Sequence, residues 1–348
     1  MSPYLFTILM ANLGLGTFIT LSSTHWFLAW LGLEISTLAI LPLMAKPHHP
    51  RATEATTKYF ITQAAAAAIL LFAATSNAWL QGQWEIQHMS HPLPTSMITL
   101  ALLLKLGLAP MHSWLPEVVQ GLDLVMGLIL STWQKLAPYA LLLQIKQTHP
   151  SLLIIIGLTS ILVGGWGGLN QTQLRKILAY SSIAHLGWMV LIIQYSTQLA
   201  VLALIIYIIM TSTMFISFKL KNATNINTLT ITWTKLPLLT ALAPLMLLSL
   251  GGLPPLTGFA PKWLMLQELT KQNLIPHATL AALAALLSLY FYLRLSYSMT
   301  LTLPPNNLAS PTQWRLTLHQ ITLPASLTLS LTLLLLPLTP LTLTLLPT

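Results

Sequence analysis

The sequence predicts an all-α protein that crosses a membrane many times. Hydrophobic residues make up 55% of its 348 residues and charged residues only 6%, whereas a soluble domain carries roughly 25% charged residues. Apolar runs of about 20 residues, the length of a bilayer-spanning helix, recur along most of the chain. We therefore expect lipid and neighbouring membrane subunits to surround it.

The length criterion predicts about eleven spans. They run near residues 3–21, 25–45, 57–80, 96–121, 123–145, 150–169, 175–195, 198–218, 237–270, 274–298 and 320–346. If the loops alternate between two sides, Lys146 and Lys271 lie opposite the N-terminus. Ten other basic residues lie on or near its own side: Lys46, Arg51, Lys58, Arg175, Lys176, Lys219, Lys221, Lys235, Arg294 and Arg315. By the positive-inside rule, the N-terminus faces the cytoplasm-equivalent compartment and the C-terminus the opposite one.

Two of the predicted spans are interrupted by proline and glycine. The fourth contains "LKLGLAPMHSWLPE" and the ninth contains "LSLGGLPPLTGFAPKWL". Each is the fourth helix of a five-helix set, and because five is odd, the second set should be inverted relative to the first. Interrupted helices at matching positions of inverted halves point to a transport site. We expect a first repeat over 1–145 broken near 105–117, a second over 150–298 broken near 251–262, and an added membrane helix over 320–348.

Four charged side chains are expected at membrane depth: Glu34, Lys105, Lys135 and Lys262. A charge at the bilayer centre costs ~2.5–3.5 kcal/mol on insertion scales, so its presence favours a functional role. A lysine near a helix end can instead extend its head to the interface. Lys105 and Lys135 lie too deep in their spans for that, whereas Lys262 depends on where the break falls. For Glu34, an ion pair with a lysine and a role in proton transfer are compatible.

The chemistry of these groups suits proton movement. Burial disfavours the charged form of lysine and glutamate alike, and a nearby opposite charge restores it. A glutamate and several lysines can therefore hold or release protons as neighbouring charges move, and water at the interrupted helices provides a path. His185, mid-span beside Ser181 and Ser182, is either a core residue or a relay; its ordinary pKa near ~6.5 suits a relay. His112, in the first break, has the same two interpretations.

Several classes of site are excluded. The chain has no cysteine, which rules out disulfides, thiolate zinc sites and iron–sulfur ligation within it. It lacks the glycine motifs of dinucleotide and phosphate binding, and no pair of histidines inside a span has metal-ligand spacing, so no cofactor or metal is expected here.

The net charge of +9 reflects loop residues that set orientation rather than nucleic-acid binding. The glycines of "VGGWGGLN" (163–170) predict close helix packing.

Three stretches resemble the signature segments of the antiporter-like subunits of respiratory complex I: "LKLGLAPMHSWLPE", "RKILAYSSIAHLGWM" and "GGLPPLTGFAPKWL". The resemblance runs from "WLGLEIS" to the C-terminal span. It implies a multi-pass subunit of the proton-pumping arm in the mitochondrial inner membrane, with its N-terminus on the matrix side and its C-terminus on the intermembrane side. It also implies roles for five residues: Glu34 as the partner of Lys105 on the first broken helix, Lys135 as the central lysine, His185 in the polar axis, and Lys262 on the exit side.

The resemblance implies partners as well. They are the antiporter-like chain 4, the small chain 4L, accessory subunits and membrane lipid, with cardiolipin a candidate. The assembly is expected to use FMN, iron–sulfur clusters and ubiquinone, which makes this chain a non-redox subunit of an H⁺-translocating NADH:ubiquinone reductase. Two alternatives stay open, a stand-alone cation/proton antiporter subunit and a structural scaffold whose lysines only bind other helices.

Overall fold

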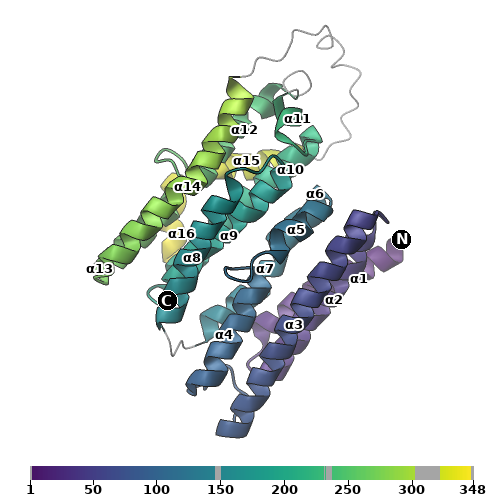
Figure 1. Ribbon diagram of the computed structural model, residues 1–348, viewed down its shortest axis with the longest axis vertical. Helices are drawn as coiled ribbons and strands as arrows, with labels where there is room; N and C mark the ends of the chain where they lie inside the picture. The colour runs from purple at the N-terminus through teal and green to yellow at the C-terminus, as the bar shows by residue number, and fades with distance from the viewer. Residues whose placement is uncertain (1, 146–149, 231, 233–236, 302–321, 346–348) are drawn as a thin grey trace. The chain divides into compact units, whose positions relative to one another are not determined.

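The fold is helical throughout the part of the chain that the computed structural model describes (Figure 1). The described residues are 2–145, 150–230, 232, 237–301 and 322–345. Across these ranges, β-structure is limited to two isolated bridges, His25 with Glu85 and Gln173 with Asn225. The all-α prediction is therefore confirmed. Three basic residues used above to predict orientation, Lys146, Lys235 and Arg315, lie outside the described residues.

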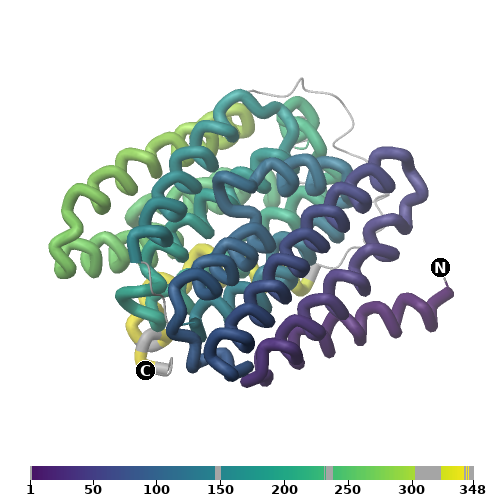
Figure 2. The backbone as a smooth tube through the Cα atoms, turned by 60° about the horizontal axis from the view of Figure 1, so that its bottom comes forward, coloured from purple at the N-terminus to yellow at the C-terminus, as the bar shows by residue number. Residues whose placement is uncertain are grey.

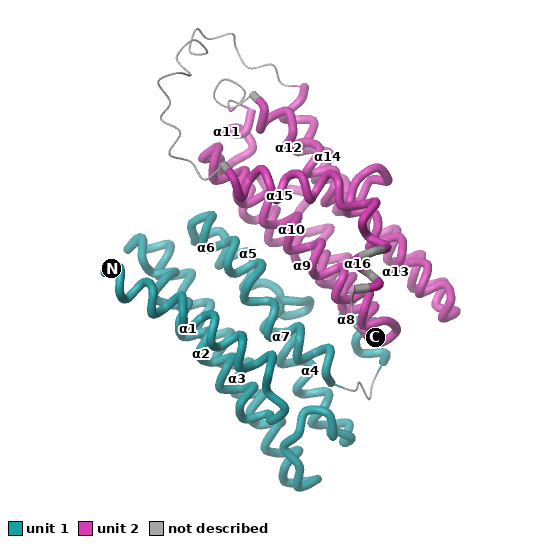
Figure 3. The backbone as a smooth tube through the Cα atoms, turned by 180° about the vertical axis from the view of Figure 1, so that it is seen from behind, with its two compact units in different colours: residues 1–156 teal, residues 157–348 magenta. Residues whose placement is uncertain are grey.

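The chain divides into two compact units, residues 1–156 and 157–348 (Figure 3). The sequence places the division at 145–150, whereas the structure places it inside a helix that begins at Pro150. The inverted relation of two five-helix sets stays a prediction.

Unit 1 begins with three long helices that lie side by side (Figure 2). They are α1 (Pro3–Ser22), α2 (Trp26–Ala45) and α3 (Pro50–Gln81), and α3 begins well before the expected residue 57. Close packing of α1 on α2 depends on two small residues. A Cβ added at Gly16 would lie 2.7 Å from the Gly32 carbonyl oxygen, and one at Gly32 would lie equally close to Gly16. Such close backbone approach is typical of membrane helix pairs.

The rest of unit 1 consists of shorter helices. They are α4 (Pro92–Leu106), α5 (Trp114–Gly121), α6 (Leu124–Ser131), α7 (Trp133–Gln144) and the first turns of α8 (Pro150–Gly168). The fourth predicted span is thus interrupted, as the sequence indicates. The fifth was expected to be continuous over 123–145, and this was wrong because the chain breaks at Thr132 between α6 and α7.

Unit 2 contains the remaining helices. They are the rest of α8, α9 (Leu174–Ile192), α10 (Thr197–Lys221), α11 (Ile226–Thr230), α12 (Pro237–Gly251), α13 (Phe259–Lys271), α14 (Ile275–Thr300), α15 (Thr322–Leu334), the 3₁₀ turn η3 (Leu336–Leu338) and α16 (Thr339–Leu345). The glycines of α8 pack as predicted: a Cβ at Gly164 would lie 2.7 Å from the Ala184 nitrogen, and one at Gly165 would lie 2.8 Å from Leu287 Cβ.

The C-terminal helix expected over 320–348 is divided. It ends at Leu334 and resumes at Thr339 after the 3₁₀ turn, because Pro337 has no N–H to continue the helical bonds. Residues 320–321 and 346–348 lie outside the described residues.

Six described helices are long and apolar enough to cross a membrane by length and composition: α1, α2, α3, α8, α10 and α14. Three shorter apolar segments belong to α4, α12 and α15. A polytopic membrane protein is the architecture that these helices support, while the expected count of about eleven spans is not established by them.

Candidate functional site

The first interrupted helix ends in a glycine cap. Gly107 has φ +78°, a conformation that glycine adopts without steric cost. Its N–H donates to the carbonyls of Leu103 and Leu104, and the N–H of Leu108 donates to Leu103 at 3.1 Å. The bonds from Gly107 to Leu104 and from Leu108 to Leu103 together form a Schellman motif. Trp114, the first residue of α5, donates its indole N–H to the Leu104 carbonyl at 3.2 Å, so the second half-helix also caps the first.

Lys105 lies in the last turn of α4, just before this cap. Its side chain is only 6% exposed. Within the described ranges, its Nζ meets no hydrogen-bond acceptor. A buried polar group without a partner is costly, so this ammonium group marks a site rather than a packing surface.

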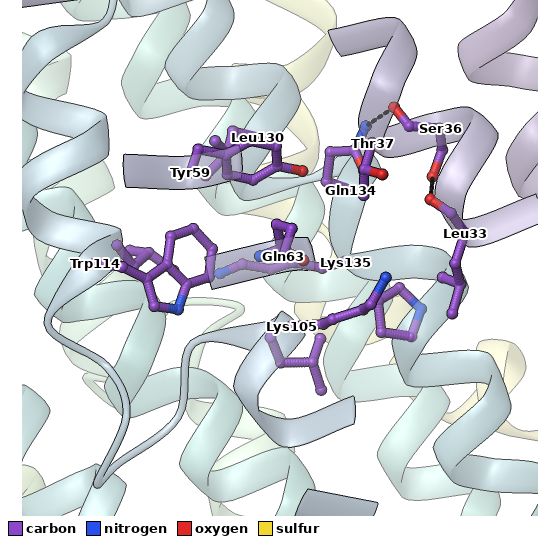
Figure 4. A pocket seen from close by; sticks show the side chains of 13 residues that line it. Leu33, Ser36, Thr37, Tyr59, Gln63, Lys105, Trp114, Leu130, Gln134 and Lys135 are labelled. Atoms are coloured by element: carbon purple, nitrogen blue, oxygen red, sulfur yellow. Dashed lines mark hydrogen bonds between the residues drawn. The ribbon is translucent and has the colours of Figure 1, made fainter. Parts of the chain in front are cut away.

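A small cavity joins Lys105 to the first turn of α7 (Figure 4). Its volume is about 10 Å³, which is close to the space that one water molecule needs. The polar side chains around it come from five helices: Ser36 and Thr37 of α2, Tyr59 and Gln63 of α3, Lys105 of α4, Trp114 of α5, and Gln134 and Lys135 of α7. The structure thus brings Lys105 and Lys135 to one cavity, as a shared role requires.

Glu34 is half-buried on α2, one turn before Thr37. The Thr37 hydroxyl lies 3.0 Å from the Glu34 backbone oxygen and 3.2 Å from its carboxylate Oε2. Among the described residues, no ion pair within 4.0 Å includes Glu34 or Lys105. A direct Glu34–Lys105 ion pair is therefore not formed in this conformation.

Lys135 lies just after the break at Thr132, which the sequence did not predict. The hydroxyls of Ser131 and Thr132 both donate to the Leu128 carbonyl, at 3.1 and 2.7 Å, and such back-bonding bends a helix. Lys135 then lies in the first turn of α7, 3% exposed. Pro138 follows inside α7 and cannot donate to the carbonyl of Gln134. The buried lysine therefore lies in a helix that is interrupted just before it and contains a proline just after it.

The second interrupted helix repeats the glycine cap. Gly252 has φ +82°; its N–H donates to Leu248 and Ser249, and the N–H of Leu253 donates to Leu248. Here a lysine supplies the cap from the second half-helix. Lys262 of α13 donates from Nζ to the Gly251 carbonyl at 2.8 Å and to the Leu250 carbonyl at 3.4 Å.

A second cavity, of about 20 Å³, brings His185 of α9 together with Lys262. Methionines from α9, α10 and α13 line it as well, together with Trp188, Ala203, Gly258 and Pro261. The His185 ring lies 5.8 Å from the Tyr207 ring, while the Ser181 and Ser182 hydroxyls donate to carbonyls of their own helix. His185 therefore contacts an aromatic ring and a cavity that also contains an ammonium group.

Each unit thus contains one pair of predicted residues, Lys105 with Lys135 in unit 1 and His185 with Lys262 in unit 2. His112 is not part of either cavity lining; its Nδ1 lies 3.1 Å from the Pro110 carbonyl oxygen. The sequence analysis missed the amides of Gln63 and Gln134. Gln63 directly precedes the alanine run of α3. A polar residue at that place in an apolar span was the only feature of the sequence that could have indicated its role. No group of three or more metal-binding side chains occurs among the described residues.

Comparison with known proteins extends over nearly the whole chain. Residues 23–288 match the family described as NADH:quinone oxidoreductase/Mrp antiporter, TM, and residues 289–343 match the NADH dehydrogenase subunit 2 C-terminus. The chain is 66% identical to the NADH-ubiquinone oxidoreductase chain 2 of Tetraodon nigroviridis, over 98% of each chain.

Two solved structures have the same fold. The structure is similar to a chain of respiratory complex I from Thermus thermophilus, with TM-score 0.83 and 28% identity, covering 97% of this chain and 80% of the other. It is also similar to a chain of the Mrp complex from Dietzia sp. DQ12-45-1b, with TM-score 0.84 and 17% identity, covering 97% and 76%. At 17% identity, the similarity to the Mrp complex chain shows a shared fold only.

Proposed function

The chain belongs to the NADH:quinone oxidoreductase/Mrp antiporter family, and from this premise we propose how its buried charges move protons. It is a proton-translocating subunit of the membrane arm of respiratory complex I. In our proposal the protons pass through Glu34, Lys105, Lys135, His185 and Lys262. The observation that carries the proposal is the pair of cavities, each of which joins two of these groups inside a membrane helix bundle.

In unit 1, the proton is held or released by Lys105 according to the position of the Glu34 carboxylate. Lys105 has no acceptor within the described residues, so its charge depends on groups that act from a distance. When the carboxylate approaches, the protonated lysine is favoured; when it withdraws, burial favours release. The released proton passes through the shared cavity toward Lys135.

In unit 2, His185 and Lys262 continue the route. An imidazole takes up a proton on one ring nitrogen and gives it up from the other, which suits a relay. Lys262 receives the proton at the second interrupted helix, where its ammonium group is held by two carbonyls. Because lysine loses its charge when it is buried more readily than arginine does, each lysine in the route can alternate between its two forms.

The redox chemistry takes place in other subunits, with FMN, iron–sulfur clusters and ubiquinone. This chain has no cysteine, and its own part is to convert the energy of quinone reduction into charge movement. The proposed setting is the mitochondrial inner membrane, with the N-terminus in the matrix and the C-terminus in the intermembrane space. Chain 4, chain 4L, accessory subunits and lipid such as cardiolipin are the proposed neighbours.

The full-length likeness to NADH-ubiquinone oxidoreductase chain 2 favours a complex I subunit over a stand-alone antiporter. A scaffold whose lysines only bind other helices is disfavoured by Lys105, which binds no other described helix through its Nζ.

The test is a Lys135→Met change in the intact complex, reconstituted in vesicles and driven by NADH. We expect the complex to assemble and proton translocation to fall at least tenfold, because methionine keeps the shape of the side chain but carries no proton. Lys219→Met, at the exposed end of α10, is the matched control and should pump normally. Normal pumping by Lys135→Met would refute the relay.

A further inference from the structure

Gln63 is a buried amide with an unused donor. It lies on α3, one turn after Tyr59, and is 4% exposed. Its Nε2 has no hydrogen-bond partner within the described ranges. An amide N–H in an apolar helix bundle loses its hydration without compensation unless something accepts its proton. This donor therefore needs an acceptor that the neighbouring side chains do not supply.

The amide lines the same cavity as Lys105 (Figure 4). Two residues with buried donors, the Gln63 carboxamide and the Lys105 ammonium group, thus line one small space, and neither Nε2 nor Nζ has a hydrogen-bond partner among the described residues. The cavity volume of about 10 Å³ fits one water molecule, and a buried water typically makes about three hydrogen bonds. A water oxygen has two lone pairs, which matches two donors.

We propose that a water molecule in this cavity accepts hydrogen bonds from Lys105 and Gln63, and that Gln63 is the residue that positions it between Lys105 and Lys135. This inference rests on the proposed function of Lys105. With both lone pairs engaged, the two O–H groups of the water point toward the remaining polar lining, to which Lys135 belongs. Gln63 thereby orients the water as a donor away from Lys105.

The proton balance of this arrangement is simple. A proton leaves the Lys105 ammonium group along its hydrogen bond to the water oxygen, while the same water gives one of its own protons to the acceptor on the Lys135 side. Lys105 ends neutral, the acceptor ends protonated and the water is unchanged. Gln63 takes no proton at any point, because a carboxamide does not titrate near neutral pH, and so acts as a positioning residue.

The first test is a density map of the intact complex at a resolution that shows ordered water. We expect a water within about 2.7–3.2 Å of both Lys105 Nζ and Gln63 Nε2. A Gln63 side chain turned to a protein acceptor, or a cavity without ordered water, would overturn the proposal. This measurement needs no variant and so does not depend on whether any substitution folds.

The second test compares two substitutions at the same position. Gln63→Met conserves volume and removes the hydrogen bonds, whereas Gln63→Asn conserves the carboxamide and removes one methylene. A positioning role predicts slower NADH-driven proton uptake in Gln63→Met, by about fivefold or more, with partial recovery in Gln63→Asn. A packing role predicts the reverse order, with Gln63→Met the faster, and would overturn the proposal.

Two controls separate this inference from the proposed function. Gln81→Met changes a glutamine at the far end of the same helix, where the amide donates to Ser90, and should pump normally. Lys105→Met tests the proposed function itself. Loss of pumping in Lys105→Met with normal pumping in Gln63→Met would overturn only the role of Gln63, whereas normal pumping in Lys105→Met would overturn the proposed function.

Discussion

The two interrupted helices end in the same way but use their lysines differently. In both, a glycine with positive φ closes a Schellman motif, at Gly107 in unit 1 and at Gly252 in unit 2. In both, a side chain of the second half-helix donates to carbonyls at the end of the first. That donor is the Trp114 indole in unit 1 and the Lys262 ammonium group in unit 2.

The consequence is a difference in how the two charges are held. Lys262 is held by carbonyls at a helix C-terminus, where the helix dipole favours a cation. Lys105 precedes its break, where the Trp114 indole caps the half-helix instead. Lys105 lines the cavity, and its Nζ has no hydrogen-bond acceptor among the described residues. The same glycine cap therefore occurs beside two different lysines. Lys262 is held by backbone carbonyls, whereas the charge of Lys105 depends on neighbouring groups.

The largest expected effect on stability comes from adding a single methyl group at Gly258, where the two halves of the second interrupted helix are in close contact. A Cβ added at Gly258 would overlap the Ser249 carbonyl oxygen, so Gly258→Ala should displace α13 and cost at least about 3 kcal/mol. We expect little assembled complex, measured as the amount of this chain on native gels. Gly251→Ala is the matched control, since its Cβ would meet only side chains at 3.7 Å or beyond; equal amounts in the two variants would contradict the packing.

Lys262→Met should destabilise unit 2. It leaves the carbonyls of Leu250 and Gly251 without their donor, and unsatisfied buried acceptors cost about 1–3 kcal/mol. The measurement is the temperature at which the purified complex loses this chain. Lys262→Arg keeps a donor and a charge, so it should restore that temperature yet fail to restore pumping; an arginine variant that pumps normally would show that the cap is the whole role of Lys262.

Trp114→Phe should have a smaller effect on unit 1. It removes the hydrogen bond to Leu104 and keeps a ring beside Tyr59, whose centroid lies 5.8 Å away. We expect a loss of about 1 kcal/mol, read from the same thermal measurement. A loss as large as that of Lys262→Met would mean that the tryptophan does more than cap the helix.

Lys105→Met should have the smallest effect on stability and, if any, a favourable one. Removing a buried charge that has no hydrogen-bond partner among the described residues eliminates its desolvation cost, whereas removing Lys262 also removes a cap. The purified Lys105→Met complex should therefore lose this chain at the temperature of the unmodified complex or above it. A clear decrease would indicate that Lys105 has a structural partner and would remove the contrast between the two lysines.

The sequence alone predicts the helical class, the two interruptions and four of the residues that line the cavities, Lys105, Lys135, His185 and Lys262. It does so because charges are rare at membrane depth, and because proline and glycine close together interrupt the hydrogen bonds of a membrane helix. It does not single out the other lining residues, such as Gln63 and Gln134. The break at Thr132 was missed, since Ser131 and Thr132 are also tolerated inside continuous helices. The Glu34–Lys105 ion pair predicted from resemblance is not formed in this conformation, in which the Thr37 hydroxyl lies 3.2 Å from the Glu34 carboxylate.

Gln63 and Trp114 show a second limit of prediction from the sequence. Their roles depend on which atoms meet across helices far apart in the sequence, and neither residue type identifies that partner in advance. Lys262, by contrast, was located at a break by sequence, but its binding to the carbonyls of Leu250 and Gly251 emerged only from the structure.

The most direct test of the account is the number of protons translocated per NADH oxidised by the reconstituted complex carrying Lys105→Met. We predict that the variant complex assembles in full. We also predict that either the number of protons translocated per NADH or the rate of NADH oxidation falls sharply. A Lys105→Met complex that oxidises NADH at the normal rate and translocates the normal number of protons would contradict the account.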